Sequence, residues 1–106
     1  MSNPLQFDDY QQAAARTANP ALNGDARLLD AAAGLAEEAG EVLGIVRKHV
    51  MQKRPLDHAA LVEELGDALW CLAMMAGTLG VSLSDVARAN ESKLRARHPD
   101  GFACTP

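Results

Sequence analysis

Hydrophobic residues recur at helical spacing along most of this chain. After Asp25, which suits an N-cap, apolar positions advance in steps of three and four as far as Met51, as on a helix with one buried face. They are Leu28, Ala32, Leu35, Ala39, Val42 and Val46. The spacing returns after Asp57, through Leu61, Leu65, Ala68, Leu72 and Leu79. The pattern therefore predicts two long helices joined by a short break at Pro55.

Turn and capping residues predict two shorter helices at the ends of the chain. Asn19-Pro20 ends a first helix that begins near Phe7. Ser82 and Asp85 have the spacing of a capping box for a last helix, which stops before Pro99. Because the connections are short, we expect consecutive helices to pack antiparallel. The prediction is an all-α, compact four-helix bundle.

Composition sets limits on the class of protein. A length of 106 residues fits one domain, 1–106, and a chain this short completes its core most easily by oligomerisation, as a homodimer or a homotetramer built from dimers. The net charge of −4 argues against a broad nucleic-acid-binding surface. No apolar stretch reaches the roughly 18 residues of a membrane span, and the start lacks a signal-peptide pattern. Cys71 and Cys104 make no disulfide framework. We therefore expect a cytoplasmic protein with no membrane or nucleic-acid partner.

Two nearly identical acidic segments interrupt the long helices. EEAGE occupies 37–41 and EELGD occupies 63–67. At about 100° per residue, Glu38 and Glu64 fall at the border of their apolar stripes, and Glu41 and Asp67 lie about 60° further round. If the two helices pack antiparallel, both borders converge on one pocket.

The acidic pairs lack the basic partners of an ordinary charged surface. Four residues after each proposed ligand stand Val42, Ile45, Ala68 and Cys71, so no helical salt bridge forms. Four oxygen donors without imidazole or thiolate suit Mg²⁺ or Mn²⁺. A solvated acidic face is the alternative, but two copies in the same register favour a metal site. Gly40 and Gly66 agree with this, because helices keep interior glycines where a ligand or another backbone comes close.

The last helix carries a cationic counterpart. Asn90, Lys93 and Arg97 share one face and could grip a polyphosphate, although a solvated basic face near a helix C-terminus is the alternative. Lys48 is a further candidate for the same role. Trp70, one turn beyond Asp67, could stack on a base or cover a subunit interface.

The order of these motifs resembles a known family. E-x-x-E (Glu38, Glu41), E-x-x-D (Glu64, Asp67) and then NESKLRARHPDGF resemble the MazG-like, all-α nucleoside triphosphate pyrophosphohydrolases over roughly residues 28 to 102. The resemblance implies cleavage between the α- and β-phosphates, which gives a monophosphate and pyrophosphate. It also implies that the four carboxylates hold Mg²⁺, that Asn90 and Lys93 lie near the phosphates, and that the chain self-associates.

The resulting hypothesis is an enzyme that clears nucleotides from the cellular pool. Glu38, Glu41, Glu64 and Asp67 would hold one to three Mg²⁺ ions, and Glu38 or Glu37 would accept a proton from the attacking water. Asn90, Lys93 and Arg97 would neutralise the phosphates. Two alternatives stay open. One is a helical oligomerisation module, which has no need of unpaired acidic pairs; the other is a nucleotide binder without turnover.

Overall fold

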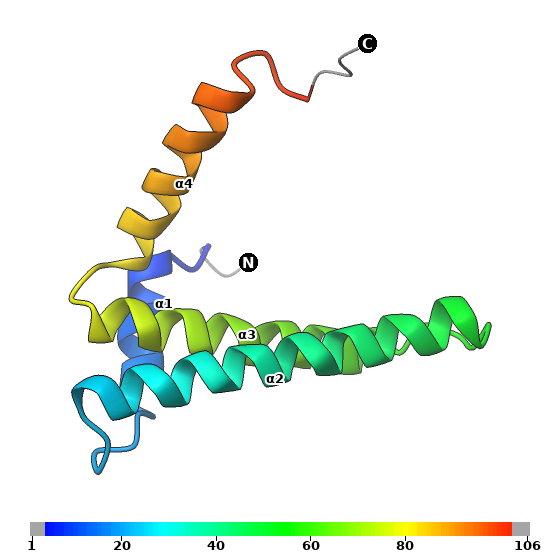
Figure 1. Ribbon diagram of the computed structural model, residues 1–106, viewed down its shortest axis with the longest axis horizontal. Coiled ribbons are helices and arrows are strands. Elements are labelled where there is room, and N and C mark those ends of the chain that lie inside the picture. Colours follow the sequence, from blue (N-terminus) through cyan, green and yellow to red (C-terminus); the bar gives the residue numbers. More distant parts are fainter. Residues whose placement is uncertain (1–3, 103–106) are drawn as a thin grey trace.

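The computed structural model describes residues 4–102, which form four helices and no strand (Figure 1). The helices are α1 (Phe7–Ala15), α2 (Gly24–Met51), α3 (His58–Thr78) and α4 (Leu83–Arg97). The predicted all-α class with four helices is confirmed. Cys104 and the end of the predicted C-terminal tail lie outside the described residues.

Capping residues mark three of the helix ends, namely both ends of α3 and the start of α4. The Asp57 carboxylate accepts a hydrogen bond from the Ala60 amide at 3.1 Å and begins α3, and Ser82 Oγ accepts one from the Asp85 amide at 3.0 Å and begins α4. Gly80, with φ +75°, follows the end of α3 in the left-handed conformation that glycine adopts freely. The N-cap of α2 is Asn23 and not Asp25 as predicted, and it makes no side-chain capping bond.

The α2 and α3 helices form a long antiparallel hairpin, and α1 crosses α3 near one end of it (Figure 1). A small core lies at this crossing. Its members are Ala14, Ala31, Ala73, Met74, Ala76 and Leu83. Within the described residues α1 does not contact α2, and α4 contacts only α1 and α3. Most of the hairpin therefore extends beyond the core.

The prediction that consecutive helices pack antiparallel holds for α2 and α3 but is wrong for the other two pairs. Within the described residues α1 and α2 do not pack together, and α3 and α4 meet at 100° (Figure 1). For α3 and α4 the reason is that α1 binds the connection between them. Gln11 donates to the Val81 carbonyl at 3.0 Å and accepts from the Leu83 amide at 2.9 Å, and Asp8 accepts from the Ser84 amide at 3.1 Å. These bonds hold the start of α4 against α1 instead of along α3.

A single chain is more open than a compact bundle. Its radius of gyration is 16.8 Å, against roughly 13 Å for a typical domain of about 100 residues. Large apolar side chains of the hairpin stay exposed, including Leu29, Leu43, Val62 and Leu65. Within residues 4–102 no single helix is long and apolar enough to cross a membrane; α3 and α4 would reach that length and hydropathy only as a bent pair.

Candidate metal centre

Three carboxylates converge in the middle of the hairpin. Glu38 and Glu41 from α2 and Glu64 from α3 each place one oxygen within 4.8 Å of the other two. The antiparallel register brings Glu38 and Glu64 to the same level, and Glu41 follows one turn later on the exposed side. Glu38 and Glu64 are half-buried, whereas Glu41 is exposed. The cluster is thus open to solvent on one side and covered by the two helices on the other.

Only part of the predicted apolar stripe of α2 is covered. Leu28, Leu35 and Val42 are half-buried as expected, whereas Ala32, Ala39 and Val46 are exposed, and the covered side also carries Ala31 and Glu38. Glu38 therefore lies within the helix contact and not at its border. Periodicity alone cannot separate a stripe that faces a helix of the same chain from one that is left exposed.

The carboxyl groups of the cluster perturb one another. The pKa of Glu41 is raised from its ordinary value, chiefly by a hydrogen bond that the protonated group shares with Glu64 and then by the charge of Glu64. The pKa of Glu64 is also raised, chiefly by the corresponding bond with Glu38. When all three carboxyl groups are ionised, no proton is present to form these hydrogen bonds. One buried oxygen each of Glu38 and Glu64 then has no hydrogen-bond partner within residues 4–102.

These observations fit a divalent metal ion. A hard cation would bind the two partnerless oxygens and neutralise three carboxylates that otherwise repel one another. Asp67, the fourth predicted ligand, is exposed and is not one of the three converging groups. Its charge nevertheless raises the pKa values of Glu41 and Glu64, so it lies close to them. Its role as a ligand stays a prediction.

A hollow of about 220 Å³ adjoins the cluster on the side toward α1. We call it the Trp70 hollow; it is lined by Asp30, Gly34, Glu38, Asp67, Trp70 and Cys71. The Trp70 indole donates a hydrogen bond to Thr17 Oγ1 at 2.7 Å, which fixes the orientation of the ring. Burial raises the pKa of Tyr10, and the charges of Asp67 and Cys71 add to the effect, so the phenol also lies near this hollow.

Sequence reasoning did not single out Asp30 as part of the site. The signal was available, because eleven residues separate Asp30 from Glu41 and therefore place the two about 20° apart around α2. Gly34 was missed for a different reason. A Cβ atom at this position would lie 3.0 Å from the sulfur of Cys71, which sequence periodicity does not reveal.

A second hollow, of about 380 Å³, lies at the α2–α3 connection. We call it the tip hollow; it is lined by Ile45, Lys48, Arg54, Pro55 and Asp57. The predicted phosphate ligand Lys48 is thus on the hairpin, toward its tip. Arg54 was not predicted, since it follows the end of α2 at a break that carries no periodic signal.

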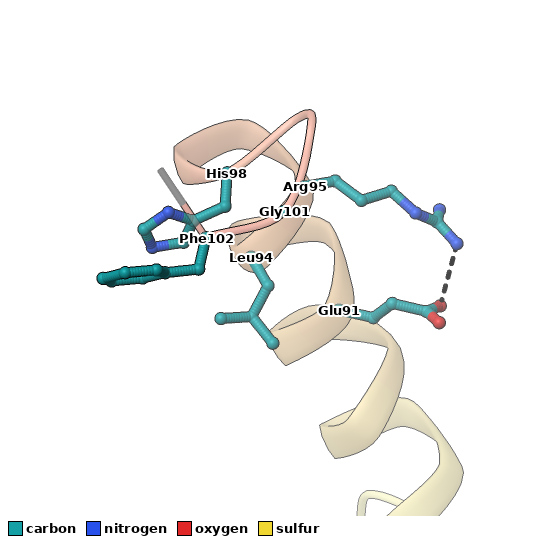
Figure 2. A pocket seen from close by; sticks show the side chains of 6 residues that line it. All are labelled: Glu91, Leu94, Arg95, His98, Gly101 and Phe102. Atoms are coloured by element: carbon teal, nitrogen blue, oxygen red, sulfur yellow. Dashed lines mark ion pairs between the residues drawn. The ribbon is translucent and has the colours of Figure 1, made fainter. Parts of the chain in front are cut away.

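In one chain, the structure does not bring the other predicted phosphate ligands to the carboxylates. Asn90, Lys93 and Arg97 are exposed on α4, which has no contact with α2. Figure 2 shows the C-terminal end of α4, where Arg95 pairs with Glu91 at 3.4 Å. In the same helix Arg88 pairs with Asp85 at 3.0 Å, whereas among the described residues Lys93 and Arg97 form no ion pair. Their phosphate role stays a prediction.

Comparison with known proteins agrees with this arrangement. The model of the MazG nucleotide pyrophosphohydrolase domain matches residues 28–102, which include the three converging carboxylates and Asp67. The chain belongs to the MazG family. MazG proteins are associated with nucleotide pyrophosphohydrolase activity and depend on metal ions, and the Glu38, Glu41 and Glu64 cluster is able to hold one.

Two relatives extend the comparison. The Gene 37 protein of Mycobacterium phage L5 is 34% identical over 105 residues, which cover 92% of this MazG chain and 92% of the relative. The uncharacterized protein YvdC of Bacillus subtilis (strain 168) is 38% identical over 72 residues, 59% of this chain and 68% of the relative. No solved structure matches the chain. Neither relative's name states an activity.

Proposed function

We propose that this chain is a Mg²⁺-dependent nucleoside triphosphate pyrophosphohydrolase that clears nucleotides from the cellular pool. The observation that carries the proposal is the convergence of Glu38, Glu41 and Glu64, with buried oxygens that have no partner in the described chain. A structural acidic cluster would be expected to satisfy those oxygens with donors. The membership of the MazG family supports the reaction class.

The reaction would be a hydrolysis at the α-phosphorus. The oxygen of a water molecule attacks this phosphorus, the bond to the oxygen bridging the α- and β-phosphates breaks, and pyrophosphate leaves. Mg²⁺ held by the carboxylates would supply charge neutralisation and polarise the phosphoryl group. Glu38 or the exposed Glu37 would accept the proton of the water, and the half-buried position of Glu38 keeps its carboxylate fixed toward the cluster.

Product analysis tests the proposal. The purified protein is incubated with Mg²⁺ and a panel of normal and modified nucleoside triphosphates, and the products are separated. We expect monophosphate and pyrophosphate in equal amounts. Inorganic phosphate and a diphosphate would instead indicate attack at the γ-phosphorus, and no product from any nucleotide would contradict an enzymatic role.

A matched pair of variants links the activity to the cluster. Glu64→Gln removes one converging carboxylate and should lower the rate by about a hundredfold or more, since the loss of a group that only hydrogen-bonds to a metal ligand commonly costs tenfold to a hundredfold. Glu63→Gln removes the same charge from the exposed neighbouring position and should leave most of the rate. Mg²⁺ or Mn²⁺ should raise the melting temperature of the Glu63→Gln variant but not that of Glu64→Gln.

A further inference from the structure

We propose that the tip hollow binds the β- and γ-phosphates of the nucleotide, and that the nucleoside lies at the Trp70 hollow on the other side of the carboxylates. This inference rests on the proposed function and deepens it, because it gives the substrate a direction along the hairpin and adds Arg54 to the site. It follows from the position, the charge and the fixed geometry of the two hollows.

The two hollows and the cluster lie in a row along one side of α2. Lys48 follows Glu41 by seven residues, which places it about 10 Å further along the helix axis and within about 20° of the same direction. Asp30, in the Trp70 hollow, precedes Glu41 by eleven residues and also lies within about 20°. A ligand held at the cluster can therefore extend toward the Trp70 hollow at one end and the tip hollow at the other.

The charges of the tip hollow favour an anion. In the part of the chain that the structure describes, neither Lys48 nor Arg54 forms an ion pair. The hollow contains one carboxylate, that of Asp57, and this group accepts the capping bond from Ala60 at the start of α3. The first turn of α3 carries no other acid, so its positive dipole end adds to the effect. Two cations thus face a space with a single carboxylate, and that carboxylate already accepts the capping hydrogen bond.

The backbone holds Arg54 in place beside Lys48. The Arg54 amide donates to the Lys48 carbonyl at 3.4 Å, and the Arg54 carbonyl lies 2.7 Å from Nδ1 of His49. Lys53, between them, adopts the left-handed conformation with φ +53°, which turns the chain back toward α2. The dipole of α2 explains why Lys48 and His49 stand at its C-terminus. It does not explain why hydrogen bonds hold the backbone of Arg54, which lies beyond the helix.

The charge of the Trp70 hollow is negative, in contrast to that of the tip hollow. Asp30, Glu38 and Asp67 line it, so a β- or γ-phosphate placed there would meet three carboxylates. An uncharged nucleoside avoids this repulsion. The indole ring held by Thr17 offers a face for stacking, and Asp30 can accept a hydrogen bond from an N–H or O–H group of the nucleoside. Electrostatics therefore decides the direction in which the nucleotide lies.

Calorimetry with two probes, pyrophosphate and AMP, tests the assignment in the presence of Mg²⁺. Lys48→Ala and Arg54→Ala should each weaken pyrophosphate binding about tenfold or more, the effect of losing a hydrogen bond from a charged group, and should leave AMP binding nearly unchanged. Arg47→Ala is the matched control, because it removes one charge from the same end of α2 at an exposed position outside the hollow. Trp70→Leu should weaken AMP binding and spare pyrophosphate.

Three results would overturn the inference. The first is an equal loss of pyrophosphate binding in all three cation variants, which would indicate general charge attraction. The second is no loss in any of them, and the third is a loss of AMP binding in Arg54→Ala. Because the assay needs no turnover, the two proposals can fail separately. Pyrophosphate binding through Arg54 without nucleotide hydrolysis would contradict only the enzymatic function, and hydrolysis that is indifferent to Arg54 would contradict only the tip hollow.

Discussion

At the residue scale, the carboxyl groups of Glu41 and Glu64 tie the stability of the metal-free chain to pH. Both have pKa values above the ordinary value of 4.5, because their protonated forms share hydrogen bonds within the cluster. The folded chain therefore binds protons more tightly than the unfolded chain does. The stabilisation is fully present below the ordinary value and is lost as the pH rises through the raised values. A divalent cation bound by the cluster would take over the role of the proton at neutral pH.

We therefore expect the metal-free chain to lose stability as the pH rises from about 4.5 toward neutrality, and Mg²⁺ to restore it. Thermal unfolding with a chelator, recorded across this range, measures the effect. Glu64→Gln should flatten the pH dependence, because the amide keeps a donor for its neighbours and carries no charge. The quantity to compare is the difference in pH dependence between this variant and the wild type. Identical slopes would contradict the assignment.

At the element scale, the helices could be predicted from sequence more fully than their packing. Asp57, Ser82 and Gly80 mark helix ends through local hydrogen bonds and backbone conformation, which depend on nearby residues only. The bend between α3 and α4 depends on Gln11, whose contacts with Val81 and Leu83 span about 70 residues of sequence. No local pattern reports such a contact.

Some residues of the candidate site could be predicted from local sequence, and others could not. The repeated acidic spacing predicted that Glu38, Glu41 and Glu64 lie together, because the antiparallel register places Glu38 level with Glu64. Asp67, which takes the position of Glu41 in the second motif, is not one of the converging groups. Arg54 could not be predicted, since its position beside Lys48 depends on how the connection folds back on α2. The exposed position of α4 could not be predicted either, because it follows from the bend that α1 imposes.

Glycines in α2 provide a test of helix packing. Replacing a helix-interior glycine by alanine normally stabilises a protein by about 1 kcal/mol. Gly44 has no atom within 4 Å of the added Cβ, so Gly44→Ala should show this gain in urea unfolding. At Gly34 the Cβ would lie 3.0 Å from the sulfur of Cys71, a buried side chain with little room to move, so Gly34→Ala should show no gain or a loss.

A double-mutant cycle identifies the cause. In a Cys71→Ala background the sulfur is gone, and Gly34→Ala should then stabilise the chain by about 1 kcal/mol, as at Gly44. If Gly34→Ala behaves alike with and without the sulfur, the close contact between α2 and α3 at this level is not as described.

At the scale of the whole molecule, the hairpin has two unlike faces. Counting about 100° per residue, Leu43 and Leu65 lie on the side of α2 and α3 away from Glu41 and Asp67. They belong to an apolar face whose large exposed members on the two helices are Leu29, Leu43, Val46, Val50, Val62, Leu65 and Leu72. The chain exposes 8281 Å², whereas a folded monomer of its mass exposes roughly 5,700 Å². We infer that a second copy of the chain covers this face.

Charge substitution in the apolar face tests this assembly. Wild-type protein should sediment as a dimer or a tetramer, and Leu65→Glu, which introduces a charge where the side chain is 54% exposed in one chain, should shift it toward the monomer and lower its melting temperature. Leu5→Glu is the control, since Leu5 is also exposed but precedes α1, away from the hairpin. A wild-type monomer at micromolar concentration would contradict the inference.

Assembly also bears on the cationic face of α4. Lys93 lies on a helix that extends away from the carboxylates of its own chain, and α4 is about 22 Å long, enough to lie along a neighbouring chain. If Asn90, Lys93 and Arg97 contact the phosphates, they therefore do so from a second copy.

We expect Glu64→Gln and Lys93→Ala to be nearly inactive when purified separately. A mixture of the two that has been dissociated and reassembled should recover part of the wild-type rate. Recovery is possible because a mixed dimer contains one site with neither substitution. A mixture as inactive as its components would mean that Lys93 serves the carboxylates of its own chain.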